Sequence, residues 1–112
     1  MDIAREPHEL SIELEARAPL RRCHRAYSID VVQDLFGVWL VEMRYGRIGT
    51  TGRMKVRSFP VFAEARDQVA VCLRRRATAP RRIGVAYEVV RRRTFGSLSK
   101  ECRFALGGLS RR

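Results

Sequence analysis

Cysteine, histidine and lysine are all scarce in this chain of 112 residues. The three cysteines, Cys23, Cys72 and Cys102, lie far apart and form no C-x-x-C pair. The two histidines, His8 and His24, show no zinc-like spacing. We therefore expect reduced thiols and no cofactor, because neither a disulfide framework nor a structural metal site fits this pattern.

Long apolar runs are also lacking. No stretch approaches the roughly 18 consecutive apolar residues that would span a membrane. The N-terminal segment, MDIAREPHEL, is too acidic and polar for a signal or transit peptide. We expect a cytoplasmic protein with no membrane partner. A length of 112 residues fits one domain around a single core.

Catalytic motifs are lacking as well. The two histidines have no obvious serine or cysteine partner, and no H-E-x-x-H, G-x-S-x-G or paired-carboxylate arrangement occurs. The glycines of GRIGTTG suggest a phosphate-binding loop, but such a loop needs G-K-S/T at the start of a helix. Here the segment leads into a predicted strand, so glycines with positive φ in a hairpin explain it better. We expect no enzyme.

Positive charge is what the chain has in excess. The net charge is +11, and Lys55 and Lys100 are the only lysines. The arginines form clusters at 74–76, 81–82 and 91–93. Guanidinium groups present a planar fork of donors that matches phosphate, so these clusters favour a polyanionic partner. A GC-rich genome would explain why arginine replaces lysine, but it would not explain the excess of positive charge.

Apolar and polar residues alternate with the period of a strand in the first half of the chain. This pattern predicts strands over residues 9–16, 26–32, 38–45 and 54–59. The segment Asp34–Gly37 is typical of a turn, and Gly46, Gly49 and Gly52 mark a hairpin loop. The third strand is apolar on both faces, which predicts a central position with Trp39, Val41 and Met43 in the core.

One helix is predicted after Pro60, because apolar residues recur there at helical spacing. This face consists of Phe62, Ala65, Val69, Cys72 and Leu73. Acidic residues near its start and the arginines at 74–76 near its end suit the helix dipole, so that triplet can simply cap the helix. Pro80 blocks continuation, and residues 85–90 can form a closing strand.

These elements predict an α+β fold: an antiparallel β-sheet of about five strands with one α-helix packed on one face. We place the domain at residues 10–92. Residues 1–9 form an acidic extension, and residues 93–112 form a basic tail. This tail can be flexible, because the chain beyond Thr94 lacks clear periodicity.

A longer run carries a family resemblance: YSIDVVQDLFGVWLVEMRYGRIGTTGRMKVRSFPVFAEA. A D-L-F-G turn at 34–37 is followed by Y-G-R-I-G-T at 45–50 and by F-P at 59–60. This ordered series resembles the WGR domain family, in particular its short bacterial form, over roughly residues 13–88. Two departures occur. The family's tryptophan is Tyr45 here, and the family's basic-then-G-Y ending is stretched over residues 74–87.

The resemblance implies an antiparallel sheet with one helix that binds DNA or RNA without catalysis. In eukaryotic poly(ADP-ribose) polymerases, the WGR domain helps to engage DNA ends. By this similarity, Tyr45 would pack against a sugar or base, and Arg47 would contact phosphate or bridge to a partner protein. The alternatives are that Tyr45 packs under the hairpin and that Arg47 forms a salt bridge within the loop.

Three cations, Arg53, Lys55 and Arg57, alternate along the fourth predicted strand and so share one face at about 6–7 Å per step. This is close to the spacing of phosphates along one nucleic-acid strand, but a solvated outer face would show the same pattern. The candidate binding residues are Tyr45, Arg47, Arg53, Lys55, Arg57, Arg74, Arg75, Arg76, Arg81 and Arg82.

Two functional hypotheses follow. The first is a nucleic-acid-binding module, for DNA rather than RNA and with duplex ends as one form of the ligand, that acts as a monomer or weak dimer. The second is an adaptor that docks an acidic protein partner through the same surface.

Overall fold

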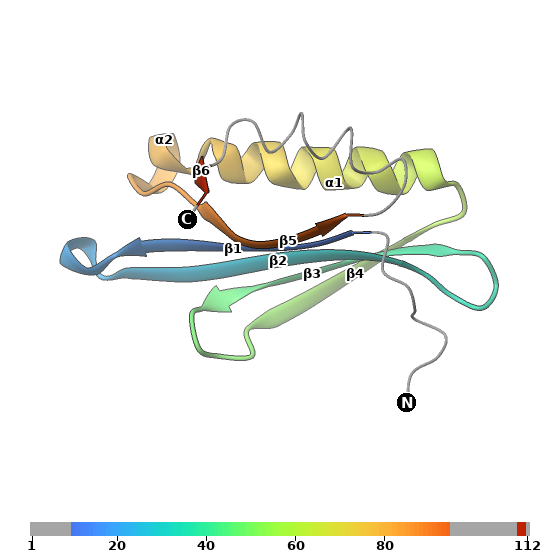
Figure 1. Cartoon of the computed structure of the whole chain (residues 1–112), viewed down its shortest axis with the longest axis horizontal. Helices are drawn as coiled ribbons and strands as arrows, with labels where there is room; N and C mark the ends of the chain where they lie inside the picture. The colour runs from blue at the N-terminus through green and yellow to red at the C-terminus, as the bar shows by residue number, and fades with distance from the viewer. Residues whose placement is uncertain (1–9, 95–109, 112) are drawn as a thin grey trace.

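The chain folds into one sheet with a helix laid across it (Figure 1). The computed structural model describes residues 10–94 and 110–111, with the backbone alone at Arg21, Arg82, Thr94, Ser110 and Arg111. The sheet order is β4-β3-β2-β1-β5-β6, with antiparallel pairing from β4 to β5. The strands are β1 (Leu10–Ala18), β2 (Cys23–Gln33), β3 (Trp39–Arg47), β4 (Arg53–Phe59), β5 (Glu88–Thr94) and β6 (Ser110–Arg111).

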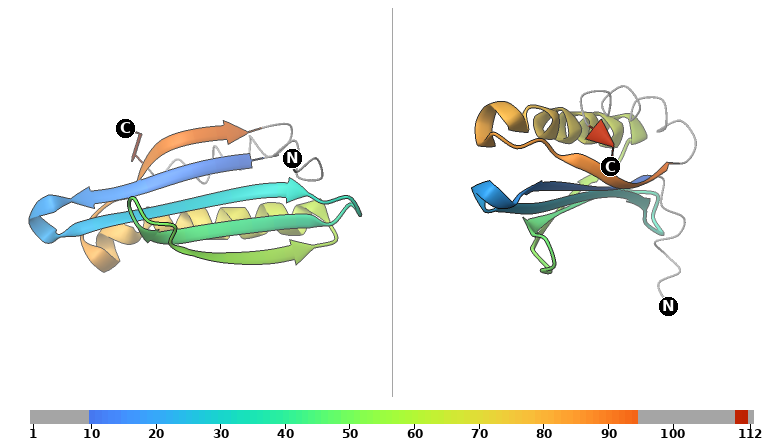
Figure 2. Two further views of the ribbon diagram at one scale, coloured as in Figure 1. Left: turned by 90° about the horizontal axis from the view of Figure 1, so that it is seen from below. Right: turned by 60° about the vertical axis from the view of Figure 1, so that its left-hand side comes forward.

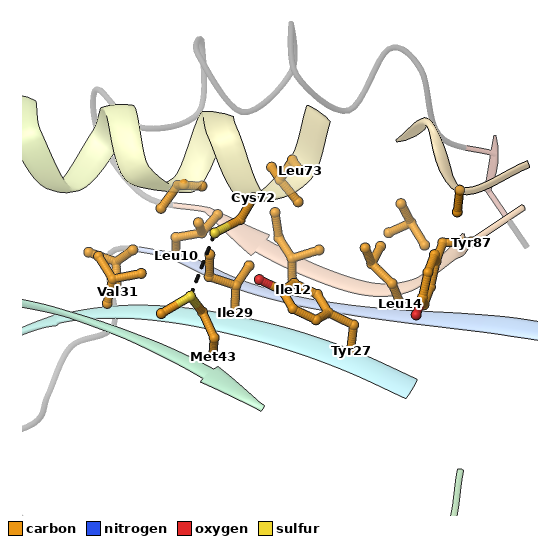
Figure 3. Close-up of a cluster of buried hydrophobic side chains, with 14 of the residues drawn as sticks. Leu10, Ile12, Leu14, Tyr27, Ile29, Val31, Met43, Cys72, Leu73 and Tyr87 are labelled. Atoms are coloured by element: carbon orange, nitrogen blue, oxygen red, sulfur yellow. Dashed lines mark hydrogen bonds between the residues drawn. The ribbon is translucent and has the colours of Figure 1, made fainter. Parts of the chain in front are cut away.

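Helix α1 (Phe62–Ala77) covers one face of the sheet, which we call the helix-side face (Figures 1 and 2). The alternation in β1 and β2 sends every second side chain to this face, where the core forms (Figure 3). The buried side chains include Leu10, Ile12 and Leu14 of β1, Tyr27, Ile29 and Val31 of β2, and Val41 and Met43 of β3. The predicted α+β fold is confirmed.

The predicted apolar face of α1 is confirmed too. Ala65, Val69, Cys72 and Leu73 are buried against the sheet, and the Cys72 thiol lies 3.6 Å from the Met43 sulfur. At the start of the helix, the rings of Phe62 and Trp39 meet edge to face, with their centroids 4.9 Å apart. Trp39 is only partly buried, so it borders the core.

The turn between β2 and β3 lies where the sequence predicts it. The Asp34 carboxylate accepts hydrogen bonds from the backbone N–H groups of Phe36 (2.8 Å) and Val38 (2.9 Å). Gly37 completes the turn at φ +82°. The length and type of this turn fix the register of the β2–β3 hairpin, that is, which residue of β2 lies opposite which residue of β3.

The hairpin loop between β3 and β4 contains two glycines of the kind that the sequence predicts, Gly49 at φ +87° and Gly52 at φ +68°. Gly46 differs, because it lies within β3 and its φ is not positive. A Cβ atom on Gly46 would lie 2.8 Å from the Gly52 Cα. Gly46 is therefore needed for the close approach of two backbone segments.

The second half of the chain differs from the sequence prediction in three ways. Pro80 does more than end a helix, because it lies in the first turn of a second short helix, α2 (Ala79–Ile83). The closing strand, predicted over residues 85–90, begins three residues later, at Glu88, and ends at Thr94, so it includes Arg93 and Thr94 from the predicted tail. Ser110 and Arg111 pair in parallel with β5, and the other residues of the predicted tail after Thr94 lie outside the described residues.

The described residues contain no helix that is both long and apolar enough to cross a membrane. They also contain no group of three or more His, Cys, Asp or Glu side chains placed to hold a metal ion.

Candidate nucleic-acid interface

A groove of about 890 Å³ opens on the helix-side face, at the end of the sheet where β2 begins and β3 ends. Its lining contains one histidine and no aspartate or glutamate among the residues that the structure describes. Five arginines line it: Arg22, Arg25, Arg47, Arg75 and Arg76. Arginines thus outnumber acidic side chains in the described lining, which makes the groove a basic surface.

Arg25 and Arg47 form the floor of this groove, directly opposite each other on β2 and β3. The N–H of Ile48 donates to the carbonyl of His24 at 2.9 Å, which makes His24 and Ile48 a hydrogen-bonded pair. The antiparallel ladder alternates, so Arg25 and Arg47 form the next, non-hydrogen-bonded pair, in which side chains lie closest. Like charges directly across a ladder destabilise the sheet, so this pair suits an anionic ligand.

The C-terminal end of α1 forms a wall of the groove. Arg75 and Arg76 lie in the last helical turn, beside the carboxyl end of the helix dipole. The Arg76 guanidinium carbon lies 3.8 Å from the centroid of the Tyr27 ring, a cation–π contact. This contact fixes the direction in which Arg76 leaves the helix and keeps its charge at the groove.

Tyr27 is buried beneath Arg76, with 2% of its surface exposed. Burial raises the pKa of its phenol well above the usual value, the neighbouring Cys72 thiol raises it further, and the Arg76 charge opposes this shift. Tyr27 is therefore neutral at physiological pH and acts as a platform for Arg76.

Tyr45 lies directly opposite Tyr27 and lines the groove. It keeps the alternation of β3, on the same face as Val41 and Met43, yet it is 40% exposed. Tyr45 is thus accessible from the groove, while its role, as a packed aromatic or as a ligand-facing one, stays a prediction.

The cations of β4 also lie on the helix-side face, because Arg53, Lys55 and Arg57 pair with Tyr45, Met43 and Val41. They share one face, as the sequence predicts, and all three are exposed. The three side chains lie outside the groove lining. Arg57 turns toward α1 and donates a hydrogen bond of 3.2 Å to the Gln68 amide oxygen. The three β4 cations thus form a row that leads away from Tyr45 along the edge of the sheet.

Two of the remaining candidates have described side chains that lie outside the groove lining. Arg74 is exposed on α1, and Arg81 is exposed on α2. The side chain of Arg82 lies outside the described residues. The structure therefore brings four of the candidates together, namely Tyr45, Arg47, Arg75 and Arg76.

Sequence reasoning missed Arg22 and Arg25, which complete the groove. The signal for Arg25 was available, because the turn at 34–37 fixes the hairpin register and so places Arg25 opposite Arg47. Arg22 gave no such signal. It ends the short η2 turn (Pro19–Arg21) in the left-handed conformation, at φ +53°, which is unusual for a residue other than glycine.

Comparison with known proteins agrees with the resemblance that the sequence motifs suggest. A family model described as the WGR domain matches residues 11–78. This range runs from β1 through α1 and contains all five arginines of the groove together with Tyr45. Comparison with curated proteins finds no match.

Proposed function

This chain belongs to the WGR domain family, and we propose that it binds DNA through its arginine-lined groove without catalysing a reaction. WGR domains are in general modules of the nucleic-acid-binding type and are not catalytic. One observation carries the proposal. Five arginines from separate segments converge on one groove in which the described residues place no carboxylate.

The groove matches the two chemical features of a nucleic-acid strand. Arg25 and Arg47 on the floor face Arg75 and Arg76 on the helical wall, so guanidinium donors surround the path of a phosphate backbone. Tyr45 supplies a partly exposed aromatic ring on which a sugar or base can pack. Contacts of this kind position a strand without reading its sequence, so we propose binding with little sequence preference.

The test is the salt dependence of binding. Fluorescence anisotropy with a labelled random-sequence duplex would measure affinity between 50 and 200 mM salt. Release of counterions from about five phosphate contacts predicts a loss of affinity of about five hundredfold over this range. An affinity that stays flat with salt, or no binding at 50 mM salt, would contradict the proposal.

The form of the ligand needs a second experiment. Blunt duplex, closed circular duplex, single-stranded DNA and RNA can be compared at one salt concentration in a gel shift. A preference for the blunt duplex over the circle would support binding at duplex ends. Unlabelled polyglutamate serves as the control competitor, because displacement of the duplex by an equal concentration of it would point to an acidic protein partner at the groove instead of nucleic acid.

A further inference from the structure

Strand β4 is an edge of the sheet among the described residues, since it pairs with β3 alone. Its side chains from Arg53 to Ser58 are all exposed. An exposed edge strand offers a row of unpaired backbone groups on which another chain can add a strand. Charged side chains on an edge strand usually protect it against such pairing. The side chains of β4 therefore determine which kind of added strand it can bind.

The hydrogen-bond pattern of the sheet identifies the backbone groups of β4 that do not pair with β3 or with another described strand. His24 and Ile48 form a hydrogen-bonded pair, so the even-numbered residues of β3 direct their backbone groups toward β2. The odd-numbered residues of β3 therefore bond to β4, at the positions of Arg53, Lys55 and Arg57. By the same alternation, Met54, Val56 and Ser58 direct their N–H and C=O groups to the outer edge.

The two faces of this edge have different chemistry. On the helix-side face lie Arg53, Lys55 and Arg57, of which Arg57 already bonds to Gln68. On the opposite face lie Met54 and Val56, which are 46% and 49% exposed. An added strand would therefore have one face against cations and the other against apolar side chains.

A second copy of this chain is disfavoured at this edge. Antiparallel pairing of two β4 strands would place the cations of one copy beside those of the other, and like charges on neighbouring strands destabilise a sheet. The same cations would attract a strand with carboxylates on one face. Charge thus disfavours pairing of two β4 edges and favours pairing of β4 with an acidic segment.

We propose that the β4 edge binds an extended acidic segment of a partner protein by strand addition. Carboxylates at alternate positions of that segment would face Arg53 and Lys55, and apolar or β-branched residues between them would cover Met54 and Val56. Backbone hydrogen bonds to Met54, Val56 and Ser58 would set the register. This site is separate from the groove, whose lining includes none of these residues.

A designed peptide of about nine residues, the length of a strand, is the probe. In this alternating peptide, glutamate alternates with valine or threonine, and both ends are blocked. The control peptide has the same composition with all the glutamates in one block, so its net charge is unchanged. We expect the alternating peptide to bind at least about tenfold more tightly. Equal affinity would overturn the proposal, because bulk charge would then explain the binding.

Val56→Pro removes one outward N–H and leaves the ladder with β3 intact, because proline is tolerated on an edge strand where its nitrogen faces solvent. We expect this variant to lose peptide affinity by at least about tenfold. The control, Val56→Thr, keeps the N–H and should bind as the original does. An unchanged affinity in Val56→Pro would overturn the proposal, provided that its melting curve shows a folded protein.

A measurement on the unaltered protein covers the case in which Val56→Pro fails to fold. Hydrogen exchange of the Met54, Val56 and Ser58 amides should slow by at least about tenfold when the alternating peptide is in excess, because each amide would gain a partner. Exchange at these three amides that stays unchanged with bound peptide would show that the edge takes no strand.

Discussion

Arg25 and Arg47 lie directly opposite each other on β2 and β3, at the floor of a groove whose described lining contains no carboxylate. Such a pair of like charges lowers the stability of the sheet. It lies at the floor of the proposed DNA-binding groove, and the large buried core on the same face offsets the stability that it loses. The pair provides the most direct test of the groove.

Arg47→Glu should separate binding from folding. It reverses one charge in the groove, so we expect DNA affinity to fall at least about tenfold. It also gives Arg25 an opposite charge across the ladder, so the free energy of unfolding should stay the same or rise by up to about 1 kcal/mol. Anisotropy and urea unfolding measure the two effects.

The matched control for this variant is Arg93→Glu, because Arg93 is exposed and pairs with Ser11 on the opposite face of the sheet. It makes the same change in net charge and should lower DNA affinity much less. If the two variants lose affinity equally, total charge controls binding and the groove does not.

Tyr45→Ala and Tyr27→Ala should fail in different ways. Tyr27 is 2% exposed, so its truncation should cost about 3–5 kcal/mol of folding stability. Tyr45 is 40% exposed, so its truncation should cost much less stability, but about 1–3 kcal/mol of binding if the ring packs on a base. Unfolding curves and DNA affinities of both variants check this. A Tyr45→Ala protein with unchanged DNA affinity would remove Tyr45 from the interface.

Arg22 should show a trade-off between stability and binding. Its left-handed conformation costs about 1 kcal/mol or more relative to glycine. Arg22→Gly should therefore stabilise the fold, while the lost guanidinium weakens DNA binding severalfold. Arg22→Ala is the control, since it loses the same charge and keeps the strained backbone. It should lose the same affinity without gaining stability.

Tyr27 should make the fold sensitive to alkaline pH. Burial raises its pKa in the folded state above the unfolded value, which lies near 10. Below about pH 10 the phenol is neutral in both states and its contribution to stability is fully present. Above that pH the unfolded state releases the proton first, so stability falls by about 1.4 kcal/mol per pH unit.

Urea unfolding at pH 9 and pH 11 checks this, with Tyr27→Phe as the comparison. The other tyrosines are present in both proteins, so the difference between them isolates Tyr27. An equal loss of stability in both proteins would show that the raised pKa of Tyr27 has no part in the alkaline transition.

Much of the fold could be predicted from the sequence, because local patterns of residues determine it. The apolar face of α1, the Asp34–Gly37 turn and the alternation in β1 and β2 each depend on residues that are close in sequence. The second helix escaped prediction for a local reason as well, since Pro80 is compatible both with a helix end and with the first turn of a new helix.

Only part of the groove could be predicted from the sequence, because its lining depends on how segments that are distant in the chain pack together. Tyr45 and Arg47 follow from the family motif, but nothing near Arg22 in the sequence indicates that it will lie beside the end of α1. The arginines at 74–76 show the same limit. They occupy one helical turn, yet the direction of the helix over the sheet places Arg75 and Arg76 at the groove and leaves Arg74 outside its lining.

The groove draws its arginines from the turn before β2, the start of β2, the end of β3 and the last turn of α1, so an unfolded chain does not possess it. A ligand that needs all of these segments binds the native state alone. Nucleic acid would then act as a folding ligand for this small domain. A free ligand concentration one hundred times its Kd would add about 2.7 kcal/mol to the free energy of unfolding.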